Sequence, residues 1–416
     1  MNRRNVIFVK TTEIIIISLC IILLILILPF YAIQTSLIGF GMLLTTILFI
    51  KIGWKNSLVM TISIVSTTLI INYLLMISGV GKSMYYRDHE MLTYVEERTG
   101  LLKYFPNANI KLIQPYGDLY AMSHMGEKES RSVDFVTDSL GFRNENEYEN
   151  EKFILVGDSF VVGNGNSQKD ILSSQLRRDF DIGTYNVAYP GNIVDYYKSV
   201  ARFRTIKGVS PRILLFIFEG NDFEDTIFDG NTKYEPQTLK EGIEIFYKNS
   251  DIYRFFDYSI NLIKKERNKL NQPSTVNTEL VFQGSVKAIP VLFFKPYIEV
   301  VKRKKTTHKL SGFEESMGSM KGQIEYVFFI PDKYRVYYNN ISTTGNLPNA
   351  QWEYLKSICE KLNIPIVNLT QPLIEEAATL LADGRFVYWR DDTHWNKYGI
   401  SVAARIVAEK IKEGKR

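Results

Sequence analysis

The sequence predicts an α/β protein, a three-layer α/β/α sandwich with a parallel sheet, preceded by an N-terminal bundle of about three transmembrane helices. Short segments that are apolar throughout, such as FILV at 153–156 and RILLFIF at 212–218, are typical of strands buried on both faces. Segments with helical patterning alternate with them, which indicates parallel strands joined by helices. The long apolar stretches before residue 80 predict the membrane part.

Three apolar stretches, 14–33, 37–50 and 58–80, open the chain. The first and third are long enough to cross a hydrocarbon core of about 30 Å, which takes about 20 helical residues. The second is shorter and reaches that length only if Lys51 and Trp54 lie at the interface. We therefore expect three spans, with two spans and a re-entrant middle segment as the alternative. No small-residue cleavage site follows the first stretch, so a signal peptide is not indicated.

Basic residues around these stretches predict their orientation. Arg3, Arg4 and Lys10 precede the first stretch, and Lys51 and Lys55 separate the second from the third. The positive-inside rule then places the N-terminus and the second loop in the cytoplasm. After three crossings the rest of the chain lies outside. We therefore expect a membrane-embedded, multi-pass protein with a periplasmic or extracellular domain.

The chain divides into a membrane anchor at 1–80, a connecting stem at 81–150 and a main α/β domain at 151–416. Within that domain, 224–320 breaks the alternation of strands and helices and is predicted to be an insert. The insert carries the basic runs KKERNK and KRKKTTHK. Such runs indicate either solvated helix faces and loops or a surface for anionic lipid or an acidic polymer.

The main domain is predicted to alternate between strands and helices outside this insert. The predicted strands are 153–156, 184–189, 212–218, 324–331 and 364–369, and the predicted helices are 170–178, 196–206, 351–362 and 400–411.

Several classes of function are excluded by composition and spacing. The net charge is only +5 and no nucleic-acid-binding signature accompanies it, so we expect no nucleic-acid partner. The two cysteines lie far apart, which argues against a disulfide framework. No group of Cys and His has metal-ligand spacing, and Gly163 and Gly165 lack the third glycine of a dinucleotide-binding loop. We therefore predict neither a metal nor a cofactor.

The triplet GDS at 157–159 follows the first predicted strand directly. Ser159 therefore stands at the carboxyl edge of a parallel sheet, where ligands bind in open α/β folds. The helix that it opens would contribute unpaired N–H groups and a positive dipole end, which favour a developing oxyanion. Asp158 is expected to act as a hydrogen-bond acceptor in the turn. The triplet alone is a weak signal, because Asp and Ser also serve as ordinary helix caps.

Three further motifs give the serine partners. Gly191 ends the second predicted strand, and Asn221 follows the third within EGND, so both could donate to a substrate oxygen. His394 lies in WRDDTHW, three residues after Asp391 and two after Asp392. A serine hydroxyl needs a histidine base, and that base needs a carboxylate to orient it.

These four blocks, in this order, resemble the SGNH (GDSL-like) hydrolase superfamily. The resemblance covers about 151–223 and 321–416, and the segments SLGFR and FFIPDKYRVYY also look like the membrane-anchored bacterial members. It implies that Ser159 is the nucleophile, that Gly191 and Asn221 complete the oxyanion hole with the Ser159 N–H, and that Asp391 and His394 complete the triad.

The tetrad DTHW is similar to one in the alginate O-acetylation proteins, an SGNH branch that acts in polysaccharide export. There the aspartate two residues before the histidine takes the triad role, which makes Asp392 the alternate acid to the favoured Asp391. The order differs from that of the best-known alginate member, because here the serine precedes the histidine motif.

The resemblance implies a serine-dependent acyl-ester hydrolase or O-acetyltransferase at a bacterial cell membrane, acting on cell-envelope or exported polysaccharide through an acyl-enzyme. Its partners would be an O-acylated glycan or acyl donor and a membrane protein that exports acyl groups. The alternative is a non-catalytic glycan-binding or assembly component. Glu219, Asp222 and Glu224 beside Asn221 could suggest a glycosidase, but no second acidic motif faces them.

Overall fold

The structure is a computed structural model that describes residues 92–95, 101–223, 279–306, 310–341 and 345–414, with isolated positions between 56 and 74. The chain divides into two compact units, and the unit made of Tyr86–Gln237 and Thr275–Arg416 holds nearly all described residues. The predicted spans 14–33 and 37–50 lie outside the described residues, as does most of 58–80, where isolated positions up to Leu74 are helical. None of the helices among the described residues combines the length and the apolar character needed to cross a bilayer.

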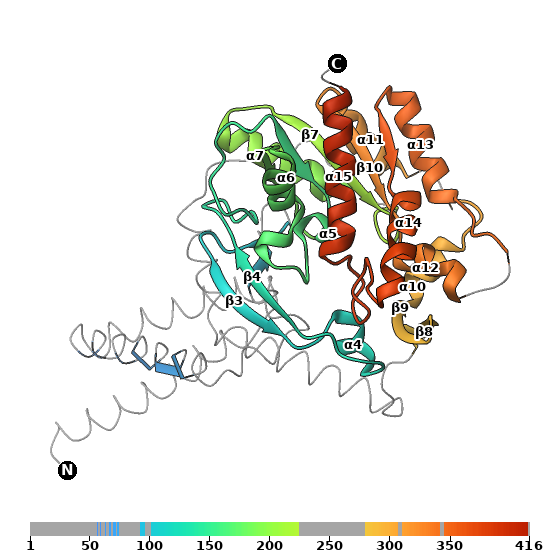
Figure 1. The fold of residues 1–416 in the computed structure, drawn as a ribbon. Coiled ribbons are helices and arrows are strands. Elements are labelled where there is room, and N and C mark those ends of the chain that lie inside the picture. Colours follow the sequence, from blue (N-terminus) through green and yellow to red (C-terminus); the bar gives the residue numbers. More distant parts are fainter. Residues whose placement is uncertain are drawn as a thin grey trace, which may run out of the picture. The chain divides into compact units, whose positions relative to one another are not determined.

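A five-stranded sheet forms the centre of the larger unit, in the order β11–β10–β7–β5–β6 (Figure 1). All four neighbouring pairs of strands are parallel. The strands are β5 (Phe153–Val156), β6 (Thr184–Asn186), β7 (Arg212–Phe218), β10 (Ile324–Ile330) and β11 (Ile366–Asn368). The predicted α/β fold with a parallel sheet is therefore confirmed.

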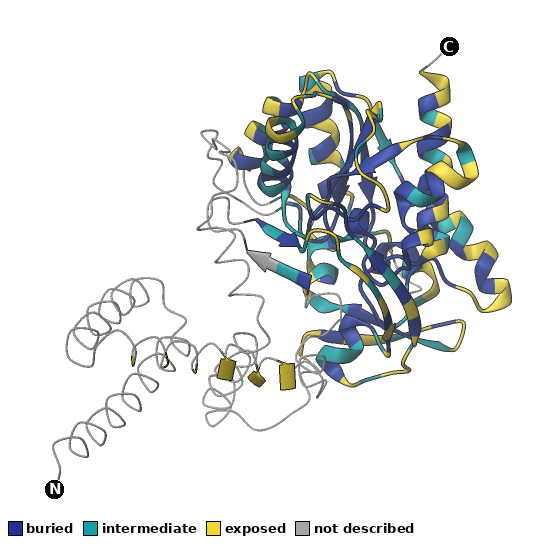
Figure 2. Cartoon of the chain, turned by 90° about the vertical axis from the view of Figure 1, so that its left-hand side faces the viewer, coloured by how far each residue is buried: buried dark blue, intermediate teal, exposed yellow. Residues whose placement is uncertain are grey.

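The sheet is buried on both faces. Every residue of β5 and all of β7 after Arg212 are buried, and Figure 2 shows this core at the centre of the unit. Strands buried in this way need helices on both sides. On the described part of the chain, α15 packs on α6 and α14, whereas α7 packs on α11. These helices are α6 (Leu172–Phe180), α7 (Ile193–Lys207), α11 (Ser311–Met320), α14 (Thr370–Leu380) and α15 (Lys397–Glu413), with α13 (Ala350–Leu362) beside β11.

One predicted strand is shorter than expected. The prediction extended it from 184 to 189, but β6 ends at Asn186. The Asn186 side-chain oxygen accepts the Ala188 N–H at 2.9 Å, while its amide donates to the Val161 carbonyl at 3.1 Å. An asparagine that bonds its own backbone two residues on turns the chain, so the strand stops there.

The expected stem is part of the main unit. Its elements are β1 (Thr93–Val95), β2 (Leu102–Tyr104), β3 (Asn109–Gln114), α4 (Asp118–Ser123) and β4 (Arg131–Val136), with β1 antiparallel to β2 and β3 antiparallel to β4. Arg143 fastens this segment to the turn at 163–166, because its buried guanidinium donates to the carbonyls of Gly163 and Asn166 at 2.8 and 2.6 Å. Burial lowers the pKa of Arg143 to about 9. Residues 101–150 therefore belong structurally to the α/β domain and do not form a separate connector.

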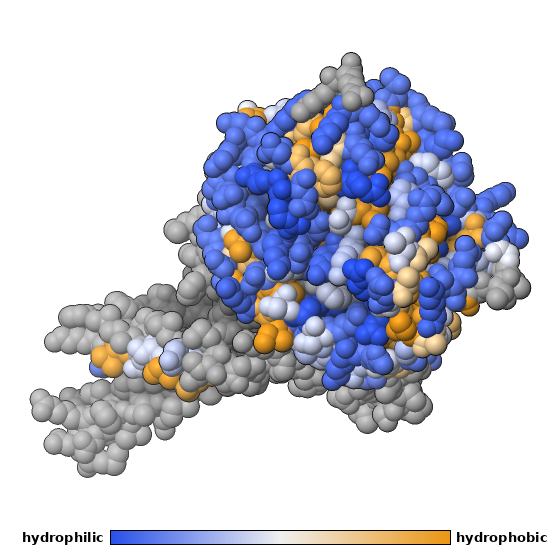
Figure 3. Space-filling view, in the orientation of Figure 1, coloured by the Kyte–Doolittle hydropathy of each residue, from blue (hydrophilic) through white to orange (hydrophobic). Residues whose placement is uncertain are grey.

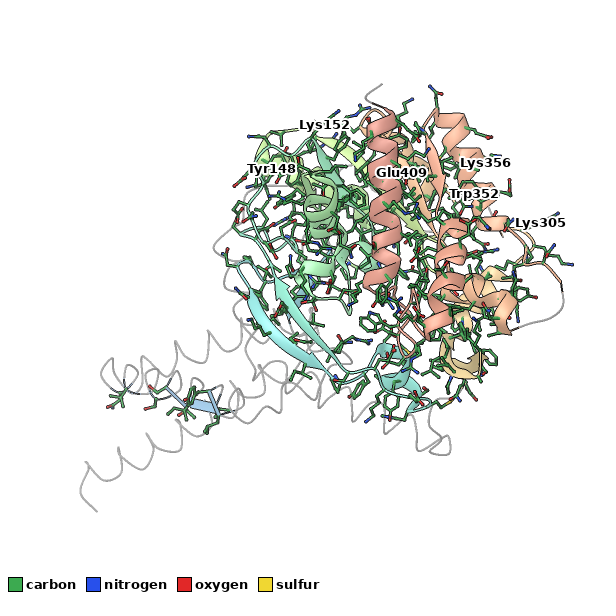
Figure 4. All side chains as sticks on the ribbon, in the orientation of Figure 1. Tyr148, Lys152, Lys305, Trp352, Lys356 and Glu409 are labelled. Atoms are coloured by element: carbon green, nitrogen blue, oxygen red, sulfur yellow. The ribbon has the colours of Figure 1, made fainter. Side chains whose placement is uncertain are left out.

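Part of the expected insert also belongs to this unit. The antiparallel hairpin of β8 (Val281–Val286) and β9 (Ile289–Phe294) is followed by α10 (Lys295–Val301), and α12 (Lys333–Ile341) follows β10. Residues 224–278, which include the first basic run, lie outside the described residues. The second run is exposed from Lys302 to Lys305, and Figure 4 shows Lys305 at the outer edge of the unit.

The carboxyl ends of the strands identify the edge of the sheet that carries the predicted site. Lys152, which precedes β5, lies at the upper edge of Figure 4. The strands therefore run toward the opposite edge, where α4 and the connection that leads into α15 lie in Figure 1. The described surface visible in Figure 3 is mainly hydrophilic with small apolar patches, as is usual for a globular domain.

Candidate active site

Ser159 is presented by a tight turn between strand and helix. β5 ends at Val156, and the short helix α5 (Ser159–Val162) begins at Ser159. Gly157 permits the turn, because a Cβ there would lie 2.6 Å from Val161 Cγ2. Asp158 Oδ1 caps the helix by accepting the Phe160 N–H at 2.9 Å. The structural role expected for Asp158 is thus present, and it leaves the serine hydroxyl at the end of the strand.

His394 lies within proton-transfer distance of this hydroxyl. Its Nε2 is 2.7 Å from Ser159 Oγ, although the two residues are 235 positions apart. Trp395 helps to hold His394 close to Ser159, because its Nε1–H donates to the carbonyl of Phe160 at 3.0 Å. The Phe160 ring also packs on the imidazole, with ring centroids 4.8 Å apart. The residues that directly follow Ser159 and His394 in the chain therefore hold the two side chains together.

The carboxylate that orients His394 is Asp392, so the preference for Asp391 was wrong. Asp392 Oδ1 lies 2.7 Å from His394 Nδ1 and also accepts the His394 backbone N–H at 3.1 Å. This is an Asx turn, in which a side chain bonds the backbone two residues on. The same turn brings the imidazole of His394, two residues after Asp392, to the Asp392 carboxylate. Two-residue spacing therefore fits the geometry better than three-residue spacing.

Asp391 faces the other way and holds neighbouring segments. Its Oδ2 accepts the N–H groups of Gly117 and Glu129 at 2.7 and 2.9 Å, and its Oδ1 lies 3.2 Å from Arg131 Nη1. Burial raises the pKa of Asp391, while Arg131 and these N–H groups act against that rise. Asp391 therefore fastens the loop of the histidine to α4 and β4.

Three charged residues that the motifs did not indicate complete the surroundings of the triad. Asp118 accepts both the N–H and the hydroxyl of Thr393, at 2.8 and 2.7 Å. Arg131 Nη2 lies 3.2 Å from Asp392 Oδ2. Lys333 Nζ donates to the carbonyl of Asp392 at 2.7 Å. Nothing in their spacing along the chain pointed to them, because they reach the site only through the folded stem and α12.

Burial shifts the pKa values of two charged residues near the site, Asp158 and Lys333. Burial raises the pKa of Asp158 to about 6, although the Phe160 N–H and nearby His394 favour its charged form. Burial lowers the pKa of Lys333 to about 8, although Asp118 and Asp392 favour its ammonium form. An ionised Asp158 therefore attracts positive charge on His394, whereas its burial favours the neutral carboxyl.

Gly191 and Asn221 lie beyond the strands that flank β5. Gly191 follows β6 and Asn221 follows β7. A Cβ at Gly191 would lie 2.6 Å from Asp195 Oδ2, so packing against the capping box of α7 already requires a glycine there. Asn221 Oδ1 is buried and forms no hydrogen bond with the described residues. Both residues thus share the sheet edge with Ser159.

Asp118, Asp392 and His394 are the described residues whose ligand atoms approach one another closely enough for a cation, within 4.8 Å. Those atoms already form hydrogen bonds to one another or through Thr393, whose hydroxyl is 3.1 Å from His394 Nδ1 and donates to Asp118. We therefore interpret the group as a hydrogen-bonded network.

The acidic residues beside Asn221 have structural partners. Glu219 pairs with Arg335 at 2.6 Å. Asp222 accepts the Tyr196 hydroxyl and the Phe218 N–H, both at 2.7 Å. Glu224 lies outside the described residues. These contacts account for Glu219 and Asp222 without glycosidase chemistry.

Comparison with known proteins gives one family. A model described as the SGNH hydrolase-like domain of the acetyltransferase AlgX matches residues 299–416, which include Asp391, Asp392 and His394. No curated protein matches the sequence. The predicted resemblance is thereby confirmed over residues 299–416, which are similar to the SGNH hydrolase-like domain of AlgX and do not include Ser159, Gly191 or Asn221.

Proposed function

We propose that the protein is a serine-dependent acyl-ester hydrolase or O-acetyltransferase that acts on cell-envelope or exported polysaccharide. One observation carries the proposal: the chain of contacts from Ser159 Oγ to His394 Nε2 and from His394 Nδ1 to Asp392 Oδ1, each 2.7 Å long. The match to an SGNH hydrolase-like acetyltransferase domain supports the same chemistry.

The first half-reaction forms an acyl-enzyme. Ser159 Oγ attacks the carbonyl carbon of an ester while its proton passes to His394 Nε2. The bond between that carbon and the alcohol oxygen then breaks, and the imidazolium returns the proton to the leaving alkoxide. Asp392 keeps the proton of the neutral imidazole on Nδ1 and stabilises the imidazolium.

The second half-reaction repeats these steps with another alcohol or with water. His394 takes a proton from the incoming hydroxyl, which attacks the acyl carbon and releases Ser159. Water as the acceptor gives an esterase, and a sugar hydroxyl gives an O-acetyltransferase. In both halves we assign the oxyanion to the Ser159 N–H, the Gly191 N–H and the Asn221 amide, because these groups follow three adjacent strands.

The place of the reaction is proposed from the first eighty residues. Their three apolar stretches and flanking basic residues favour a catalytic domain on the outer side of a bacterial cell membrane. Acetyl-CoA is scarce there, so a transferase would need a donor glycan or a membrane partner that exports acyl groups.

Ester hydrolysis and acyl transfer by the full-length protein in detergent test this proposal. Wild type is expected to hydrolyse p-nitrophenyl acetate, and Ser159→Ala to lose at least about 10³-fold in kcat. An esterase releases acetate from acetylated oligosaccharide, whereas a transferase moves acetyl onto an oligosaccharide faster than onto water. Equal inertness of wild type and Ser159→Ala on every ester and glycan would instead support the non-catalytic role in glycan binding or assembly.

A further inference from the structure

Arg131 links the two aspartates of the histidine loop. It begins β4, in the segment that the sequence indicated only as a stem, and its side chain is 4% exposed. Its Nη1 lies 3.2 Å from Asp391 Oδ1, and its Nη2 lies 3.2 Å from Asp392 Oδ2. The guanidinium plane also lies over the ring of Trp389, 4.3 Å from the ring centre. One planar fork therefore spans two adjacent carboxylates.

Asp391 and Asp392 are an unfavourable pair without such a cation. Both side chains are fully buried, and two neighbouring buried carboxylates tend to share a proton because neither water nor a counter-charge stabilises both. Asp392 accepts at both oxygens, with Oδ1 facing His394 Nδ1 and Oδ2 facing Arg131 Nη2, and a carboxyl group accepts at both oxygens without donating only while it is ionised. A proton shared by Asp391 and Asp392 would therefore weaken the hydrogen bond that orients His394.

Other charged groups face the loop from the elements packed against it. Asp118 of α4 lies behind Thr393, and Lys333 of α12 donates to the backbone carbonyls of residues 389, 390 and 392. Asp158 lies on the serine side, and Glu129 pairs with Arg390 at the edge of the loop. Lys333 thus holds the backbone of the loop, whereas Arg131 holds its carboxylates.

We propose that Arg131 is a positioning residue, which keeps the Asp391–Asp392 pair ionised and aims Asp392 at His394, with Asp391 as the counter-charge that fixes the guanidinium. The inference rests on the proposed function, because it concerns the same triad. Arginine is suited to this role, since a lysine ammonium is a single point that cannot span both carboxylates.

The pH dependence of Ser159 modification tests the proposal without a natural substrate. A fluorophosphonate reacts when Ser159 Oγ bonds to phosphorus, fluoride leaves and the serine proton passes to His394. The acid limb of the rate profile thus reports when the base becomes neutral. The full-length protein is compared with Arg131→Gln, Arg131→Lys, Asp391→Asn and the double variant Arg131→Gln/Asp391→Asn.

Arg131→Gln is expected to move the acid limb upward by about one pH unit or more, because without the cation the group of two aspartates and His394 takes up one more proton at a higher pH. That proton impairs the base on either site, since on the imidazole it blocks Nε2 and on the carboxylates it removes the acceptor of Nδ1. At neutral pH its rate should fall at least about tenfold. The double variant removes one charge of each sign and should recover most of that loss. Asp391→Asn alone should leave the limb at or below the wild-type pH.

Three outcomes separate the possibilities. An unchanged acid limb in Arg131→Gln, or a double variant no faster than Arg131→Gln, overturns the positioning role even if both proteins are slow. If Arg131→Gln does not unfold cooperatively on heating, Arg131→Lys decides, with an upward shift expected and an unchanged limb contradicting the proposal. A wild type that is never labelled at Ser159 instead refutes the proposed function itself.

Discussion

At the scale of single residues, two adjacent aspartates have different partners because of one turn. Asp392 accepts both the backbone N–H and the ring Nδ1 of His394, whereas Asp391 accepts the N–H groups of Gly117 and Glu129. Only Asp392 can therefore hold the proton of His394 on Nδ1 and leave Nε2 free for Ser159. The sequence offered both aspartates, and spacing alone could not rank them.

Asp392→Asn is expected to lower kcat for ester hydrolysis by about 10³–10⁴-fold, because an amide no longer favours the required tautomer or stabilises the imidazolium. The comparison variant is Asp391→Asn, which should lose less activity than Asp392→Asn because Asp391 does not contact the imidazole. Steady-state rates at pH 8 provide the measurement. A larger loss for Asp391→Asn than for Asp392→Asn would contradict this assignment of the acid.

Asp332, beside α12, is the clearest source of pH-dependent stability. Burial raises the pKa of Asp332 from its ordinary 3.8 to about 7, and nearby Glu219 adds to the rise. The folded protein then binds the proton more tightly than the unfolded chain, so this group's contribution to stability falls as pH rises from about 4 to about 7. Its Oδ1 accepts the Tyr334 N–H at 2.7 Å, a bond that asparagine can keep.

Asp332→Asn should therefore gain stability relative to wild type as pH rises. The difference in unfolding free energy is expected to change by about 2–4 kcal/mol in favour of the variant between pH 5 and pH 8, at about 1.4 kcal/mol for each unit of pKa. Denaturant unfolding at the two pH values measures it. A difference that does not vary with pH would show that Asp332 does not titrate in this window.

At the scale of elements, the stem segment before α4 is fitted closely to the histidine loop. A Cβ at Gly117 would lie 2.4 Å from the Asp391 carbonyl oxygen and 2.5 Å from Asp392 Cβ. The φ angle of Gly117 is −87°, which any residue can adopt. Close packing, and not backbone conformation, therefore requires glycine here.

Gly117→Ala should push α4 away from the loop, destabilise the domain by about 1–3 kcal/mol and reduce ester turnover. Gly318→Ala in α11 is the control, because a Cβ there meets no atom within 4 Å and alanine favours a helix by up to about 1 kcal/mol. Thermal unfolding and steady-state rates compare the two. Equal thermal stability and equal turnover of the two variants would mean that the histidine loop does not depend on its close packing against Gly117.

The elements that could be predicted from the sequence are those with uniform local patterns. The predicted strands 153–156 and 212–218 coincide with β5 and β7, and the helices differ by a few residues at their ends. The β3–β4 pair and α4 were not predicted. The polar–apolar alternation of β3 breaks at Ile113, which is exposed, and at Gln114, which is buried, and α4 is only six residues long. α4 packs on the β8–β9 hairpin and β4 packs on Gln168–Asp170, and local sequence does not record such contacts.

At the scale of the whole molecule, the site combines residues from distant parts of the chain. Residues 299–416, which match the AlgX domain model, supply His394 and both aspartates, whereas Ser159 begins α5 and Arg131 comes from the stem. The order of strand-end motifs was enough to predict that Ser159 and His394 meet. The contributions of Arg131, Asp118 and Lys333 could not be predicted, since each depends on how non-consecutive elements pack.

Trapping of the acyl-enzyme tests the central claim most directly. The full-length protein is mixed with an activated acetyl ester, quenched in acid and digested, and the peptides are measured by mass spectrometry. The account predicts one acetyl group on Ser159 in wild type, and none on the corresponding peptide of Ser159→Ala or on Ser159 in His394→Ala. Ester turnover without acetyl on Ser159, or equal turnover in wild type and Ser159→Ala, would contradict it.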